Sequence, residues 1–97
     1  MIFETAVLDV IPQKAQEFGY AFKQAQKIIS SMPGYIDHQL HKCIEIEIES
    51  RYLLLVKWQT LEDHTIGFRQ SAEYQQWKVL LHHFYEPFPE VQHYQVV

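Results

Sequence analysis

The chain is poor in the residues from which most cofactor and disulfide sites are built. Its 97 residues include no asparagine, one cysteine and three glycines. The single cysteine, Cys43, cannot form an internal disulfide, so the fold needs no oxidising compartment. Gly19, Gly34 and Gly67 are too scattered to form a glycine-rich phosphate loop, so we expect no flavin or nicotinamide cofactor.

Long hydrophobic runs and an excess of positive charge are also missing. The longest aliphatic run, Leu53–Val56, is far too short to cross a membrane. Met1–Val10 lacks the basic and apolar regions of a signal peptide, so a cytoplasmic location is expected. Eight Lys and Arg against twelve Asp and Glu give a net charge of −4, which argues against a nucleic-acid partner. The length predicts one domain over residues 1–97.

Aromatic rings and imidazoles, by contrast, are plentiful. The chain has six Tyr, six Phe, two Trp and six His. Aromatic walls suit a flat organic molecule, and a histidine can move a proton near neutral pH. The composition therefore favours a pocket for a small aromatic molecule.

Hydrophobic periodicity predicts seven elements. Strands are expected at Ile2–Val10, Tyr35–Cys43, Arg51–Gln59 and Val91–Val97, and helices at Gln13–Ser31, Thr60–Gln70 and Ser71–Phe84. The strict alternation of Ile44–Glu49 predicts a further strand segment, as the tail of the second strand or a hairpin arm that turns near Ser50. Because the two helical stretches of residues 60–84 follow each other directly, they count as one helical unit. The order β-α-β-β-α-β then predicts an α+β, ferredoxin-like fold with an antiparallel sheet and helices on one face.

The third strand is apolar on both faces. Alternation places Tyr52, Leu54, Val56 and Trp58 on one face and Leu53 and Leu55 on the other. An antiparallel sheet usually leaves one face to water, so both faces here need a cover. Helices can cover one, and we expect a second copy of the chain to cover the face with Leu53 and Leu55, giving a homodimer.

Several segments resemble the antibiotic biosynthesis monooxygenase family. The similarity lies in the segments 32–35, 58–64, 67–71 and 84–91 and in Tyr74, Trp77 and His93. It covers nearly the whole chain and implies a dimeric α/β barrel. Members of that family include cofactor-free monooxygenases of quinol-type molecules, heme-degrading enzymes and proteins without known activity.

The resemblance implies a pocket on the helix-facing side of the sheet. The family's best-marked site residue is a tryptophan at the end of the third strand, where Trp58 lies, and inward histidines would supply a base. The candidate catalytic residues are Trp58, His64 and His38, and the candidate substrate-binding residues are Tyr52, Phe68, Tyr74 and Arg69. For each of them a plain structural role stays open: packing for Trp58 and Tyr74, hydrogen bonding for the histidines and a solvated charge for Arg69.

Two other activities fit the residues poorly. The heme-degrading branch uses an asparagine on the first strand, a tryptophan where this chain has Phe68 and a histidine near Lys78. Metal binding is not expected either, because His38 and His41 should face opposite sides of a strand, and His82 and His83 should diverge on a helix, close to the surface. The function expected is thus a cofactor-independent monooxygenase of an aromatic molecule, or a non-catalytic dimeric module that binds a small ligand or a partner.

Overall fold

The computed structural model describes residues 1–45, 47 and 50–97. The strands are β1 (Ile2–Asp9), β2 (Tyr35–Lys42), β3 (Arg51–Trp58) and β4 (Val91–Tyr94). The α-helices are α1 (Ala15–Ile29) and α2 (Ala72–Leu81); η1 (Pro12–Lys14) and η3 (His82–Phe84) are short 3-10 turns, and η2 (Asp63–Phe68) is a π-helical turn. This order confirms the predicted ferredoxin-like arrangement.

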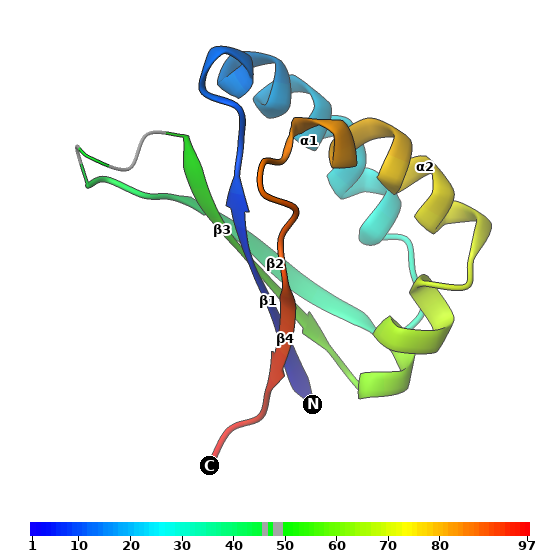
Figure 1. The fold of residues 1–97 in the computed structure, drawn as a ribbon. Helices are drawn as coiled ribbons and strands as arrows, with labels where there is room; N and C mark the ends of the chain where they lie inside the picture. Colours follow the sequence, from blue (N-terminus) through cyan, green and yellow to red (C-terminus); the bar gives the residue numbers. More distant parts are fainter. Residues whose placement is uncertain (46, 48–49) are drawn as a thin grey trace.

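The four strands form one antiparallel sheet in the order β2-β3-β1-β4. Figure 1 shows α1 and α2 lying together on one side of this sheet, with its other side uncovered. The predicted strand phase is confirmed, since Leu54, Val56 and Trp58 are buried toward the helices while Leu53 is 37% exposed. On β1 the inward residues are Glu4, Ala6 and Leu8.

The helix layer closes the core because α1 has one apolar face. Phe18, Phe22, Ala25 and Ile29 are its buried residues, as the helical period predicts. From α2, Trp77 and Leu81 are buried against the same core. Ser71 caps α2 as expected, since its hydroxyl accepts a hydrogen bond from the backbone N–H of Tyr74.

The turn between β3 and α2 is fixed by reciprocal caps. The backbone N–H of Asp63 donates to the Thr60 hydroxyl at 3.2 Å, and the Thr60 N–H donates to the Asp63 carboxylate at 3.1 Å. Gly34 lies beside this turn at φ 83°, and a Cβ there would be 2.2 Å from Asp63. The glycine is therefore needed for both its backbone angle and its lack of a side chain.

The π-helical turn changes which residues of the predicted helix Thr60–Gln70 point inward. His64 and Phe68 are buried, but Leu61, expected on the same face, is 40% exposed. A π turn holds more residues than an α turn and so rotates the face, and such turns are frequent at functional sites. A similar shift occurs on β2, where an irregularity between Tyr35 and Asp37 moves Ile36 off the face it was predicted to share with His38.

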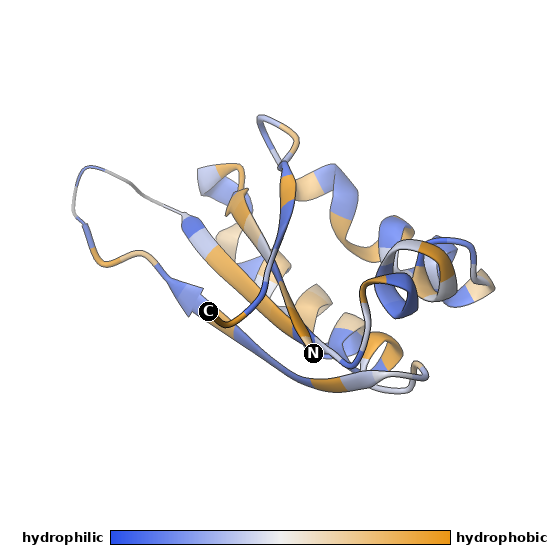
Figure 2. Ribbon diagram, turned by 90° about the horizontal axis from the view of Figure 1, so that it is seen from below, coloured by the Kyte–Doolittle hydropathy of each residue, from blue (hydrophilic) through white to orange (hydrophobic). Residues whose placement is uncertain are grey.

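The uncovered face of the sheet exposes apolar side chains on its two central strands, β3 and β1. Val7 is 46% exposed and Leu53 37%, and Figure 2 shows the hydrophobic run along β3. Within the described part of the chain, no helix combines the length and hydropathy needed to cross a bilayer.

The segment after β2 departs from the alternation pattern. Ile44 and Glu45 are outside any strand, and the expectation for residues 46, 48 and 49 lies outside the described residues. Ser50 is in a turn, as expected, with φ 60°. The last strand ends at Tyr94, three residues before its predicted end.

Candidate functional site

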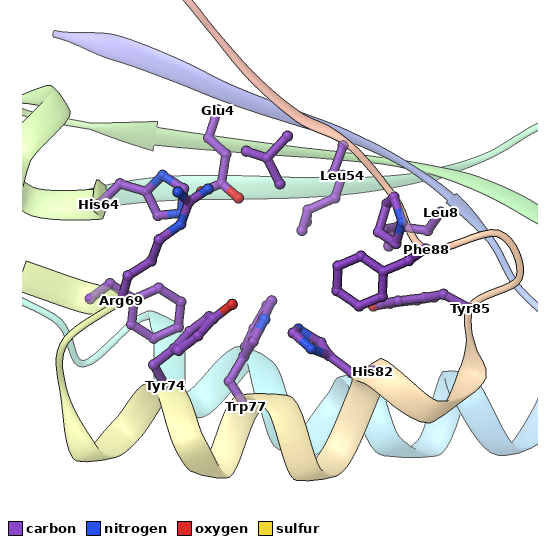
Figure 3. Close-up of a pocket in the computed structure, with 14 residues that line it drawn as sticks. Glu4, Leu8, Leu54, His64, Arg69, Tyr74, Trp77, His82, Tyr85 and Phe88 are labelled. Atoms are coloured by element: carbon purple, nitrogen blue, oxygen red, sulfur yellow. The ribbon is translucent and has the colours of Figure 1, made fainter. Parts of the chain in front are cut away.

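A cavity of about 60 Å³ lies between the sheet and the helix layer that contains α2 (Figure 3). Its wall is built from both layers: Glu4, Ala6, Leu8, Leu54 and Val91 come from the strands, and His64, Phe68, Arg69, Tyr74, Trp77, His82, Tyr85, Phe88 and Pro89 come from the helical side and the segment before β4. Glu4, His64 and Arg69 form a polar end, and Tyr85 and Phe88 an aromatic end (Figure 3).

Glu4 is the most unusual residue of this wall. Strand alternation directs its side chain into the core, where it is 6% exposed. Its Oε1 atom accepts a hydrogen bond of 2.9 Å from the indole N–H of Trp58. The same oxygen lies 3.3 Å from Nε2 of His64. One oxygen of a buried carboxyl group thus accepts a hydrogen bond from an indole N–H and lies beside an imidazole ring.

His64 connects this carboxyl group to a second histidine. The η2 turn places it inward, 3% exposed, with its ring stacked on Trp58 at a centroid distance of 5.5 Å. Its Nδ1 atom lies 2.8 Å from Nε2 of His93, which stands half-buried on β4. Three elements distant in sequence therefore contribute to one row of polar side chains in contact.

Burial dominates the proton affinities of this row. It raises the pKa of Glu4 from 4.5 to about 7, against the opposing effects of the Trp58 hydrogen bond and the Arg69 charge. It lowers the pKa of His64 from 6.5 to about 3, and Arg69 and His93 add to this shift. Burial and Arg69 also lower the pKa of His93. Near neutral pH the imidazoles are neutral, and Glu4 is the group poised to gain or lose a proton.

Arg69 supplies positive charge at the polar end of the cavity. It follows the η2 turn, and Figure 3 shows its side chain reaching toward His64 and Glu4. A guanidinium in this position can attract the anionic oxygen of a ligand. The aromatic end includes Tyr85, whose pKa burial raises above 10, so its phenol stays protonated.

The structure brings some of the predicted site residues together. His64, Phe68, Tyr74 and Arg69 line the cavity. Trp58 is fully buried behind its wall and contacts the wall residues Glu4, His64 and Phe68. Our expectation that Trp58 itself would form the wall is corrected in this respect.

Two predicted residues lie elsewhere. His38 faces the helices as expected, but it does not line the cavity. It contacts Phe22 and Gln26 of α1 and Tyr35 of its own strand. Tyr52 packs against Phe18, with ring centroids 5.0 Å apart, near the other end of β3. Alternation gave both residues the correct face but could not tell how far along the strand the cavity extends.

Three contributors were not predicted. Glu4 could have been found, because it is a charged residue on the inward face of a strand whose other inward residues are Ala6 and Leu8. His82, expected near the surface, is on the cavity wall, whereas His83 is exposed. The contact of His93 with His64 joins residues 29 apart and has no local sequence signal.

Comparison with known proteins agrees with this architecture. The family model described as antibiotic biosynthesis monooxygenase matches residues 1–79. The chain belongs to the antibiotic biosynthesis monooxygenase family. The chain is 58% identical over 97 residues to a curated protein, the uncharacterized protein YczJ of Bacillus subtilis (strain 168), and the match covers all of both chains.

Solved structures share the fold closely. A crystal structure from Bordetella bronchiseptica that carries the same family name is 34% identical, with a TM-score of 0.90 and coverage of 99% of this chain and 96% of that chain. SnoaB, a cofactor-independent oxygenase from Streptomyces nogalater, has a TM-score of 0.83 over 99% of this chain and 92% of its own, at 14% identity. At that identity the likeness to SnoaB concerns the fold alone. The residues of the cavity must therefore carry any argument about chemistry.

Proposed function

We propose that the protein is a cofactor-free monooxygenase of a small, electron-rich aromatic molecule of the quinol or anthrone class. The observation that carries the proposal is Glu4, a buried carboxyl group on an aromatic-lined cavity whose pKa is raised to about 7. A base of that pKa is matched to proton removal at neutral pH. Membership of a family described as antibiotic biosynthesis monooxygenases supports the same conclusion.

The proposed reaction needs no outside reductant. A base removes a proton from an acidic C–H or O–H of the substrate, and the resulting anion gives an electron to O2. For a substrate methylene, one oxygen atom becomes the new carbonyl, and the other leaves as water with the two methylene hydrogens. The substrate carbon supplies all four electrons that O2 takes up.

Each part of the cavity has a proposed role. Glu4 is the base, Trp58 and His64 hold its carboxyl group, and Arg69 stabilises the anion that forms. Phe68 and Tyr74 provide flat walls for an aromatic ring. This differs from the sequence-based expectation in making Glu4, not His64, the proton acceptor, because the pKa of His64 is lowered to about 3. His38 and Tyr52 receive no role.

The size of the cavity favours a second function. A volume of about 60 Å³ is well below the roughly 300–1,000 Å³ of typical ligand pockets. Turnover therefore needs the wall to open, and Phe88, which is 61% exposed, is the most exposed hydrophobic residue of the wall. If the wall does not open to substrates of that size, the protein is a dimeric module that binds a small ligand without turnover.

An oxygen-uptake assay separates these functions. The protein, with no added flavin, metal or nicotinamide, is mixed with a panel of reduced polyphenols and anthrones. We expect O2 uptake above the protein-free rate, reduced by about 10²- to 10⁴-fold in Glu4→Gln, which removes the proposed base. Glu17→Gln, an exposed acid on α1, is the matched control and should be unchanged. Absence of uptake, with ligands still quenching tryptophan fluorescence, would establish the binding module instead.

We also propose that the protein forms a homodimer through the uncovered face of the sheet. Phe3, Val7, Leu53 and Leu55 point to that face. Apolar groups grouped on one sheet face are the usual mark of a contact with another molecule. A second copy of the same face would cover these apolar side chains without any other partner.

A further inference from the structure

The α2 side of the cavity carries two hydrogen-bond donors that the protein itself does not use. Figure 3 shows the side chains of Tyr74 and Trp77 reaching into the cavity from α2. They are three residues apart and so lie on the same face of the helix. Among the residues that the structure describes, neither the Tyr74 hydroxyl nor the Trp77 indole N–H has a hydrogen-bond partner.

Trp77 is the more informative of the two, because it is only 7% exposed. An indole N–H can donate but cannot accept, and a buried donor without an acceptor costs free energy. In the described part of the chain, no polar side-chain atom is both enclosed and unpaired. The Trp77 N–H therefore borders open space, and because the residue lines the cavity, that space is the cavity.

Packing does not account for this N–H group. The Trp77 ring stands edge-on to Phe22 and Phe68, at centroid distances of 6.1 and 5.7 Å, and both contacts are between ring carbons. Trp58, the second of the two tryptophans in the sequence, donates its N–H to Glu4 at 2.9 Å. One indole N–H thus serves the protein, and the other is left for whatever enters the cavity.

Glu4 faces Trp77 from the sheet side of the cavity. Its Oε1 atom accepts the Trp58 hydrogen bond, whereas its Oε2 atom has no partner among the described residues and, not being enclosed, borders the cavity as well. Figure 3 shows Glu4 entering from the sheet and Trp77 from the helix. A flat molecule between them would meet a carboxyl group at one edge and an N–H donor at the other.

We propose that Trp77, with Tyr74 beside it, donates hydrogen bonds to the substrate oxygen on which negative charge develops when Glu4 removes a proton. This inference rests on the proposed function, since it takes Glu4 as the base. It narrows the substrate class to a ring system that carries a carbonyl oxygen on the side opposite the reacting C–H bond, as in an anthrone.

The proton transfer balances without any other reactant. Glu4 takes the proton of the C–H bond on Oε2, and the electron pair of that bond delocalises through the ring onto the carbonyl oxygen. The carboxylate loses its charge and the substrate oxygen gains it. Donors that are already in place at this oxygen stabilise the charge as it forms. A simple quinol instead loses an O–H proton, so its charge stays beside Glu4 and gains less from Trp77.

The first test observes the indole N–H groups and needs no activity. The two tryptophans give two indole signals in a nitrogen-15 correlation spectrum, and Trp77→Phe assigns them. In the free protein we expect the Trp77 N–H to exchange with water faster than that of Trp58, which is bonded to Glu4. Addition of 2,6-dihydroxyanthraquinone, an unreactive probe with ring carbonyls, should shift the Trp77 signal more. Slow exchange at Trp77, or a Trp77 signal unmoved by the probe, would overturn the proposal.

The second test separates hydrogen bonding from packing. The matched probe is 2,6-dihydroxyanthracene, which has the same three rings and hydroxyl groups but no ring carbonyl. Trp77→Phe should weaken binding of the anthraquinone about 3- to 10-fold and change that of the anthracene by less than about 2-fold. Loss of ring area in the variant affects both probes, so equal weakening would show that Trp77 only packs against the ligand.

The third test measures turnover with two substrates. For an anthrone we expect kcat to fall about 10²-fold in Trp77→Phe with little change in KM, and to fall also in Tyr74→Phe. For a hydroquinone, kcat should change by less than about 3-fold. Tyr20→Phe, at an exposed tyrosine of α1, is the control and should leave both rates unchanged. Equal losses with the two substrates would contradict the proposed contact.

These tests distinguish failure of the contact from failure of the proposed function. If the wild type takes up no O2 but the anthraquinone shifts the Trp77 signal, the oxygenase is refuted and the ligand contact stands. If O2 uptake from an anthrone is the same in Trp77→Phe as in the wild type, the contact is refuted and the oxygenase stands.

Discussion

The two faces of the sheet break the usual polarity rule in opposite ways. The helix-covered face carries a carboxyl group, Glu4, among apolar side chains. The uncovered face carries the apolar side chains of Val7 and Leu53 where polar side chains would be expected. Each exception costs free energy in an isolated chain. In the proposed function the inner exception is the base, and the outer one is a surface for assembly. Both proposals thus start from residues whose polarity does not match their position.

The largest expected effect comes from placing a charge on the outer face. In Leu53→Glu each dimer would bury two unpaired carboxylates related by the twofold axis, at about 3–5 kcal/mol each. We expect a shift from about twice the 11.6 kDa chain mass to the monomer mass in size-exclusion chromatography with light scattering. Val79→Glu, at a residue 76% exposed on α2, should stay dimeric. A monomeric wild type at micromolar concentration would refute the proposed dimer contact through the uncovered face.

A cavity in the inner layer should come next. Phe22 is 5% exposed and packs edge-on against Trp77 at 6.1 Å between centroids. Phe22→Ala should lower the free energy of unfolding by about 3–5 kcal/mol in urea titrations at fixed protein concentration. Tyr20→Ala, on the exposed side of the same helix, should change it by less than about 1 kcal/mol. Equal losses in the two variants would mean that α1 is packed in another phase.

Removal of the buried charge should stabilise the protein, but only at high pH. The pKa of Glu4 is about 7 in the folded chain and 4.5 in the unfolded chain, so the unfolded state binds fewer protons between these values and stability falls as pH rises. Above pH 7 the ionised carboxylate costs about 3 kcal/mol, from a shift of about 2.5 units at 1.36 kcal/mol each.

Glu4→Gln should therefore be more stable than wild type at pH 8, by up to about 3 kcal/mol, and nearly equal to it at pH 4. The amide oxygen can still accept the Trp58 hydrogen bond. Urea unfolding at both pH values measures the difference, with Glu17→Gln as the exposed control. A stability loss in Glu4→Gln at pH 8 would show that the ionised carboxylate is well satisfied where it lies.

Sequence periodicity was sufficient for the fold but only partly for the site. Alternation in β3 gave the correct inward face. The prediction that His64 points inward is also confirmed, because the direction of a side chain on a helical turn depends on neighbouring residues in the sequence. The extent of the cavity is not local, so Tyr52 was assigned to it and His82 was not. The row of Glu4, His64 and His93 joins three separate elements, and only the folded chain shows that they meet.

The protonation midpoint of Glu4 tests the central claim most directly, because the proposed base and the pH-dependent stability both depend on it. Carbon-13 NMR of the glutamate side-chain carboxyl, assigned by its loss in Glu4→Gln, follows this group alone. The account predicts a midpoint near pH 7, raised further in Trp58→Phe, which removes the indole hydrogen bond that lowers the pKa of Glu4. A midpoint near the ordinary value of 4.5 would contradict it.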